Sequence, residues 1–184
     1  MNTSLPFRTQ ARTIDHLGRE QIADSPTAIS ELWKNAYDAY ATSVSLHIFD
    51  SPLVCAGIFD DGTGMDRTDF TERWLVLGTA SKVDDATRER DTKGLPIRES
   101  QGQKGIGRLS VAFLGPLLFL ISRKRDNGFI ASLIDWRLFE NPFLMLEDVH
   151  IPFAEFNDAR VQGTPMQRAF PECFPADRWF ATFL

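Results

Sequence analysis

The chain has 184 residues, 43% of them hydrophobic and 24% charged, which is ordinary for one globular domain with a sizeable core. A formal net charge of -5 at pH 7 excludes a strongly basic protein, so nucleic-acid binding is not implied for this segment. The two cysteines, Cys55 and Cys173, show no CxxC spacing, which indicates no disulfide framework or zinc site and favours a reducing, cytoplasmic compartment.

The first half of the chain predicts a helix followed by two strands. Ser25 and Pro26 are typical of a helix start, with Ser25 as the N-cap, and residues 27–41 continue without a breaker. Apolar and polar residues then alternate from Val44 to Ile48, and residues 53–59 form a second short apolar run. We expect two adjacent strands here.

The middle of the chain predicts a helix, a loop and another helix. Residues 66–77 are expected to be helical, with acidic residues in the first turn. Between residues 82 and 99 lie five basic and five acidic residues and few apolar ones, so residues 79–103 are expected to form a mobile loop. Helical structure is expected again over residues 105–114.

The last third predicts strands. Residues 117–123 and 129–136 form a predicted hairpin around Asp126-Asn127-Gly128, and residues 143–149 are expected to be a further strand. Residues 177–184 show an apolar helical pattern without a stop signal, which is typical of a chain that continues. No segment is long and apolar enough to span a membrane. The element order favours an α+β two-layer sandwich.

Three polar side chains share one face of the first predicted helix. Glu31, Asn35 and Asp38 lie at positions i, i+4 and i+7, within about 60° of one another on an α-helix. The neighbouring arc is apolar, so the helix can bury one side and present these oxygen atoms at its border. A solvated polar stripe is the alternative interpretation.

Two glycine-containing segments accompany this helix. The segment DDGTGM, from Asp60 to Met65, follows a predicted strand, where glycines allow a tight turn and close contact with a flat ligand. The segment GQKGIG, from Gly102 to Gly107, precedes a predicted helix and would offer backbone N–H groups to phosphates. An ordinary Asp-Gly turn and a simple connecting loop are the alternatives.

The three segments occur in an order that resembles the GHKL superfamily of DNA gyrase, heat-shock chaperones, histidine kinases and MutL. ELWKNAYDA is similar to its N-box, DDGTGM to its adenine box and GQKGIGRLS to its glycine-rich lid box. VQGTPM, at residues 161–166, resembles a later Gly-Thr segment, and LGTASK, at residues 77–82, is similar to the MutL, chaperone and microrchidia branches.

The resemblance implies a Bergerat-type fold, in which a mixed, mostly antiparallel sheet carries helices on one face. Residues 1–24 would be an N-terminal segment, residues 25–170 the ATP-binding domain with a lid over residues 79–103, and residues 171–184 the start of a following element. The chain would then be part of a longer protein.

The resemblance also implies roles for individual residues. Glu31 would be the general base for ATP hydrolysis, Asn35 would bind Mg²⁺, and Asp60 would accept the adenine amino group. Asp38 would hydrogen-bond around the site. The remaining nucleotide-binding residues would be Gly62, Gly64, Met65, Lys82, Gly102, Lys104, Gly105, Ile106 and Gly107.

The implied activity is slow, Mg²⁺-dependent ATP hydrolysis that drives conformational change or dimerisation of a larger protein. The full protein would form a nucleotide-dependent homodimer through the lid and the N-terminal segment. A module that senses ATP without hydrolysing it is the main alternative. Phosphotransfer of the histidine-kinase type is disfavoured, because those enzymes usually carry asparagine or histidine where this chain has Glu31.

Overall fold

A computed structural model describes residues 4–50, 54–77, 91–101, 107–125, 127–156 and, for the backbone only, 181–183. The helical segments are α1 (Arg12–Gly18), η1 (Arg19–Gln21), α2 (Ser25–Asp38), α3 (Arg67–Asp69), η2 (Phe70–Trp74), η3 (Gly107–Ser110), α5 (Val111–Leu114), η4 (Trp136–Glu140) and η5 (Leu146–Asp148). The strands are β1 (Val44–Phe49), β2 (Cys55–Asp60), β3 (Leu117–Arg123), β4 (Phe129–Asp135), β5 (Phe153–Phe156) and β6 (Ala181–Phe183).

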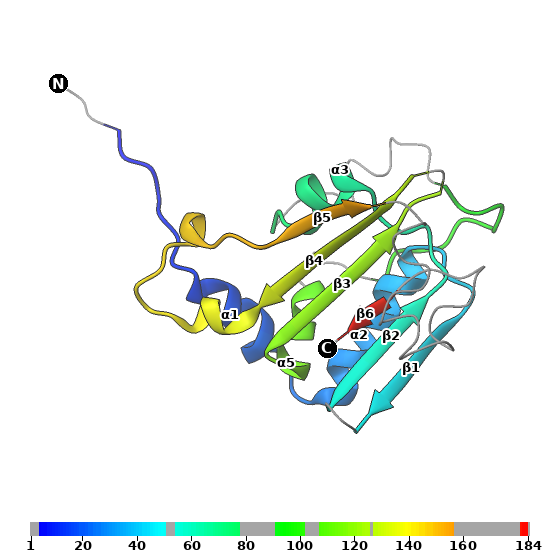
Figure 1. The fold of residues 1–184 in the computed structure, drawn as a ribbon, viewed down its shortest axis with the longest axis horizontal. Helices are drawn as coiled ribbons and strands as arrows, with labels where there is room; N and C mark the ends of the chain where they lie inside the picture. The colour runs from blue at the N-terminus through cyan, green and yellow to red at the C-terminus, as the bar shows by residue number, and fades with distance from the viewer. Residues whose placement is uncertain are drawn as a thin grey trace.

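The strands form one sheet in the order β1-β2-β6-β3-β4-β5, and each described pairing is antiparallel. Helices α2 and α5 lie behind this sheet in Figure 1, and α1 lies beside the end of β4, so the molecule has two layers. The α+β fold expected from the sequence is therefore confirmed. Among the described residues, no helix has the length and apolar character that a membrane span requires.

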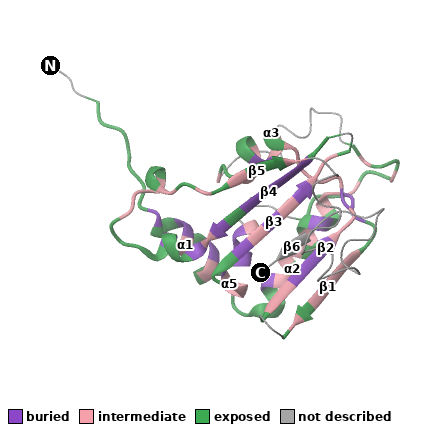
Figure 2. Ribbon diagram, in the orientation of Figure 1, coloured by how far each residue is buried: buried purple, intermediate pink, exposed green. Residues whose placement is uncertain are grey.

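The core lies between the central strands and the helical layer. In β3 the buried residues Leu118, Leu120 and Ser122 alternate with partly exposed ones, so one face of the strand points inward. Their apolar partners come from both ends of the chain, including Ile14 of α1 and Val111 of α5. Figure 2 shows the same concentration of buried residues along β3 and β4. Helix α1 is thus part of the core, although the sequence predicted only an N-terminal segment there.

Several helix boundaries differ from those predicted. Asp24, not Ser25, caps α2, because its side chain accepts a hydrogen bond of 2.8 Å from the Thr27 backbone N–H. The helix ends at Asp38, before Tyr40, whose φ of 59° lies in the left-handed region.

The helix predicted over residues 66–77 is short. An α-helical turn, α3, passes into the π-helix η2, and Asp66 is the N-cap with a capping box to Asp69. The segment after Gly107 begins as a 3-10 helix before it becomes α-helical in α5.

Two predictions for the end of the chain are wrong. Residues 143–149 contain the 3-10 segment η5 and a single bridge between Gln10 and Met145 instead of a strand, and β5 follows later. Residues 181–183 form strand β6 between β2 and β3, not a helix. The element expected after residue 170 therefore contributes to the same sheet. Most of the expected lid, residues 79–90 and 102–103, and the segment 161–166 lie outside the described residues.

Candidate nucleotide-binding site

Helix α2 and the adenine-box segment meet at the end of β2. Asn35 of α2, Ala39 directly after α2 and Asp60 of β2 line one cavity of about 190 Å³. Its other lining residues are mainly apolar: Leu32, Ala36, Ile58, Gly64, Met65, Trp74, Arg108, Val111, Leu118, Leu120 and Ile121. An apolar cavity with a few polar groups is the usual form of a small-molecule site.

Asp60 is a partly buried hydrogen-bond acceptor in this wall. Burial raises the pKa of Asp60, and the neighbouring Asp61 raises it further, while the backbone N–H of Gly62 and the Lys93 ammonium lower it. The Gly62 N–H donates to Asp60 Oδ1 over 2.9 Å, which leaves the carboxylate further acceptor positions. A ligand amino group in the cavity would fit this acceptor.

Close packing at Gly62 explains why this position carries glycine. A Cβ atom there would lie 2.8 Å from Asp60 Oδ1 and 2.9 Å from the backbone oxygen of Ala39. Gly64, two residues later, has a φ of 66°, which glycine adopts at little cost. The tight turn therefore requires glycine for two different reasons.

Replacement of Gly62 by alanine is expected to destabilise the fold and displace the Asp60 side chain. Overpacking of this kind costs about 1–3 kcal/mol in the free energy of unfolding. Thermal unfolding should show a lower melting temperature, and calorimetry should show weaker nucleotide binding. A variant with unchanged stability and binding would mean that the turn relaxes freely at Gly62.

Asp61 fixes the connection between α2 and β1 against the glycine turn. Its carboxylate accepts backbone N–H bonds from Thr42 at 2.7 Å and Ser43 at 2.8 Å, and it also accepts the Thr42 hydroxyl proton. Although burial alone would raise the pKa of Asp61, these bonds and Lys93 lower it to about 2. Asp61 is thus a structural carboxylate, whereas its neighbour Asp60 faces the cavity.

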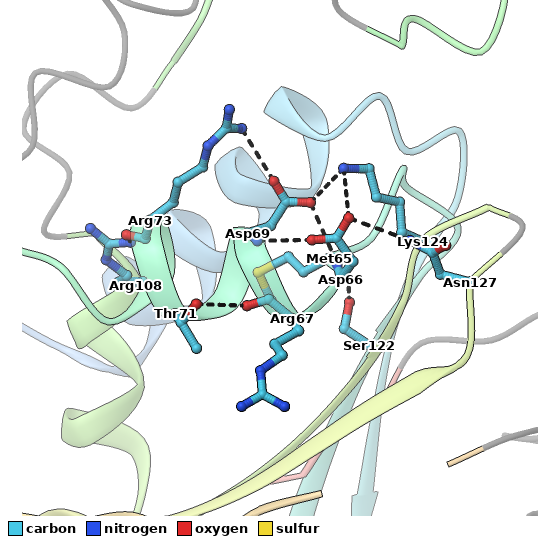
Figure 3. A network of polar contacts seen from close by, with 10 residues as sticks. All are labelled: Met65, Asp66, Arg67, Asp69, Thr71, Arg73, Arg108, Ser122, Lys124 and Asn127. Atoms are coloured by element: carbon cyan, nitrogen blue, oxygen red, sulfur yellow. Dashed lines mark hydrogen bonds and ion pairs between the residues drawn. The ribbon is translucent and has the colours of Figure 1, made fainter. Parts of the chain in front are cut away.

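A polar network holds the far end of the glycine turn to the hairpin of β3 and β4 (Figure 3). The Met65 backbone N–H donates to the buried Ser122 hydroxyl over 2.9 Å. Lys124 donates to Asp66 at 3.1 Å and to Asp69 at 2.7 Å. These contacts fix Met65 where it lines the cavity, and sequence reasoning did not identify them.

Glu31 lies where helix α2 approaches the glycine-rich segment. Its Oε1 accepts a hydrogen bond of 2.6 Å from Lys34, and a Cβ atom on Gly107 would lie 2.7 Å from its Oε2. The Glu31 carboxylate thus lies directly against Gly107. The structure brings together Glu31 and Gly107, which are 76 positions apart in the sequence.

Asp38 lies outside the cavity wall. Its carboxylate accepts the Gln101 backbone N–H at 2.8 Å and the Ser100 hydroxyl at 2.9 Å. Arg98 reinforces the same contact, because its guanidinium donates to the backbone oxygens of Tyr37 and Ala41 at the end of α2. Asp38 therefore supports the approach to the glycine-rich segment.

Of the residues predicted for the site, Asn35, Asp60, Gly64 and Met65 line the cavity, and Glu31, Gly62 and Gly107 lie around it. The other predicted residues, Lys82, Gly102, Lys104, Gly105 and Ile106, lie outside the described residues. Sequence reasoning missed Trp74 and Arg108, although Arg108 directly follows Gly107. In the described part of the chain, no three His, Cys, Asp or Glu side chains cluster as a metal site.

Comparisons with known proteins identify a family for most of the chain. A family model described as histidine kinase-, DNA gyrase B-, and HSP90-like ATPase matches residues 23–142. The chain is 27% identical over 117 residues to the DNA mismatch repair protein MutL of Endomicrobium trichonymphae, an alignment that covers 63% of this chain and 18% of the relative.

Two further relatives show similar coverage. Identity is 32% over 93 residues with MutL of Anaeromyxobacter sp. (strain K), covering 50% of this chain and 14% of the relative. The identity is 30% over 120 residues with the putative type II restriction enzyme HgiDII of Herpetosiphon aurantiacus, an alignment that covers 64% of this chain and 18% of the relative. The similarity therefore spans less than a fifth of each relative's length.

Proposed function

Because this chain belongs to the family of histidine kinase-, DNA gyrase B- and HSP90-like ATPases, we propose that it binds ATP with Mg²⁺ in the cavity beside α2 and hydrolyses it slowly. Membership of this family implies ATP binding. The observation that best supports the proposed site is the partly buried Asp60 carboxylate in the cavity wall, at the closely packed Gly62 turn. An acceptor there suits the adenine amino group, and the apolar walls suit the base.

The proposed roles of the polar residues follow from their positions. Asn35 contributes an amide to the cavity wall, and an amide oxygen is a suitable ligand for Mg²⁺, which takes most of its other ligands from phosphates and water. Mg²⁺, when bound, would neutralise phosphate charge. Glu31 is proposed to orient and deprotonate the attacking water, because its carboxylate lies against Gly107.

Replacing Asn35 with alanine is expected to abolish the dependence of ATP binding on Mg²⁺, because the metal loses its protein ligand. Titrations of ATP with and without Mg²⁺ should give nearly equal affinities for this variant and different affinities for the unchanged protein. Asn141→Ala is a matched control, since Asn141 is exposed and does not line the cavity. A normal Mg²⁺ effect in Asn35→Ala would remove Asn35 from the metal site.

A second candidate function is ATP sensing without turnover. The Lys34 ammonium donates a hydrogen bond of 2.6 Å to Glu31 Oε1, one of the two carboxylate oxygens that could accept a proton from water. Steady-state phosphate release by the full-length protein distinguishes the two functions. Turnover that depends on Glu31 supports the ATPase, while tight binding without phosphate release supports the sensing module.

We further propose that ATP binding drives a conformational change or homodimerisation of the full-length protein. The relatives described above are much longer than the segment that matches this chain. Sedimentation of the full-length protein with ADP and with a non-hydrolysable ATP analogue tests this proposal. Association should increase only with the analogue. Identical sedimentation and identical hydrogen exchange over residues 79–103 in both states would contradict it.

A further inference from the structure

Arg108 is a partly buried arginine in the wall of the proposed ATP cavity. It follows Gly107 in η3, and its guanidinium reaches the segment that supplies Trp74 to the same cavity. Its Nη1 donates to the Arg73 backbone oxygen over 2.5 Å, and its Nη2 donates to the Val76 backbone oxygen over 3.0 Å. Figure 3 shows the side chain beside the backbone of Arg73.

The third nitrogen of this guanidinium is not used. Arg108 Nε is buried and has no hydrogen-bond partner among the described residues. Leaving a buried donor unpaired is costly, and buried N–H groups normally have a protein, water or ligand partner. The two carbonyl oxygens accept hydrogen bonds from Nη1 and Nη2, but neither provides an acceptor for Nε.

The charge of Arg108 also has no counterion among the described residues. Its two acceptors are neutral carbonyl oxygens, and no ion pair joins it to a carboxylate in the described part of the chain. Burial lowers the pKa of the guanidinium. Arginine nevertheless stays protonated in proteins. A partly buried cation with an unpaired Nε–H at a cavity wall suits an anionic partner.

We propose that Arg108 binds a phosphate of the nucleotide through its Nε–H, while its Nη atoms remain on the carbonyl oxygens of Arg73 and Val76. This inference rests on the proposed ATP binding and assigns phosphate recognition to a side chain beyond the glycine-rich segment. An anion at Nε would supply both the missing acceptor and the missing negative charge. It would also connect the phosphates to the end of the helical segment that carries Trp74.

The test compares adenosine, AMP, ADP and ATP as ligands of the unchanged protein, Arg108→Met and Arg108→Lys in calorimetric titrations. Methionine keeps a long unbranched side chain and removes the charge. Adenosine affinity should stay the same, whereas ATP affinity should fall about tenfold to a hundredfold in Arg108→Met. The ATP affinity of Arg108→Lys should lie between those of the unchanged protein and Arg108→Met. Lysine restores the positive charge but lacks the several fixed N–H donors of the guanidinium. The first ligand in the series to show a difference identifies the phosphate that Arg108 binds.

Arg137→Met is the matched control, because Arg137 is exposed, pairs with Asp135 and does not line the cavity. An equal loss of affinity for adenosine and ATP would show that Arg108 only supports the fold, and unchanged affinities for all four ligands would show that it contacts no phosphate. Either result would overturn this inference and leave the proposed ATP binding intact. If Arg108→Met does not fold, Arg108→Lys supplies the same comparison. Absence of ATP binding by the unchanged protein would contradict the proposed function itself and, with it, this inference.

Discussion

Asp60→Asn is expected to bind ATP about tenfold to a hundredfold more weakly than the unchanged protein, because a hydrogen bond to a charged acceptor is worth roughly 1.5–3 kcal/mol. Asparagine has almost the same shape, and its side-chain oxygen can still accept the Gly62 N–H. It replaces one acceptor oxygen with an amino group, however, which cannot accept a bond from adenine. Calorimetric titration with ATP measures the change.

The stability of the same variant separates lost recognition from misfolding. Burial raises the pKa of Asp60 above its ordinary value of 3.8. The unfolded chain therefore loses this proton at lower pH than the folded protein, so the contribution of Asp60 to stability falls as the pH rises from 3.8 through the folded pKa. The neutral asparagine side chain removes that cost, and the melting temperature of Asp60→Asn at neutral pH should be equal or higher.

A control for Asp60→Asn is Asp50→Asn, because Asp50 is an exposed carboxylate at the end of β1, outside the cavity. This variant should bind ATP normally. Undiminished affinity in a folded Asp60→Asn protein would remove Asp60 from the proposed adenine contact. A lower melting temperature would instead assign Asp60 a structural role.

Glu31→Gln is expected to keep ATP binding and to lose about a hundredfold to ten-thousandfold in turnover, which is the usual contribution of a general base. Glutamine keeps the size of the side chain above Gly107, so the close packing there is retained. It cannot take a proton from water. Single-turnover hydrolysis by the full-length protein, alongside a binding titration, measures the two effects separately.

Glu20→Gln is the matched control for this substitution, since Glu20 is exposed in η1 and pairs with His16. Its turnover should equal that of the unchanged protein. Full turnover by Glu31→Gln would disprove the catalytic assignment. Weakened ATP binding by the variant would mean that Glu31 contributes to holding the ligand and that its ion pair with Lys34 shapes the site.

Local patterns in the sequence were sufficient for several elements. Alternating polarity predicted β1, and the hairpin pattern predicted β3 and β4. In β3 the burial itself alternates, because one face of that strand lies on the core. The wrong strand over residues 143–149 shows the limit of such patterns. That segment is apolar, yet its backbone pairs only at Met145, and a 3-10 turn interrupts it.

The sequence by itself determined which chemical groups are available: three oxygen-bearing side chains on one helix face, a carboxylate before a glycine turn and a glycine-rich segment. Helical spacing and backbone freedom are local properties, so neighbouring residues fix them. Only the tertiary structure decided that β6 inserts between β2 and β3 and that Glu31 lies against Gly107. The same holds for the buried, unpaired Nε of Arg108. These features depend on contacts between residues that are far apart in the sequence. Local sequence patterns do not predict which groups such contacts bury or which charges they pair.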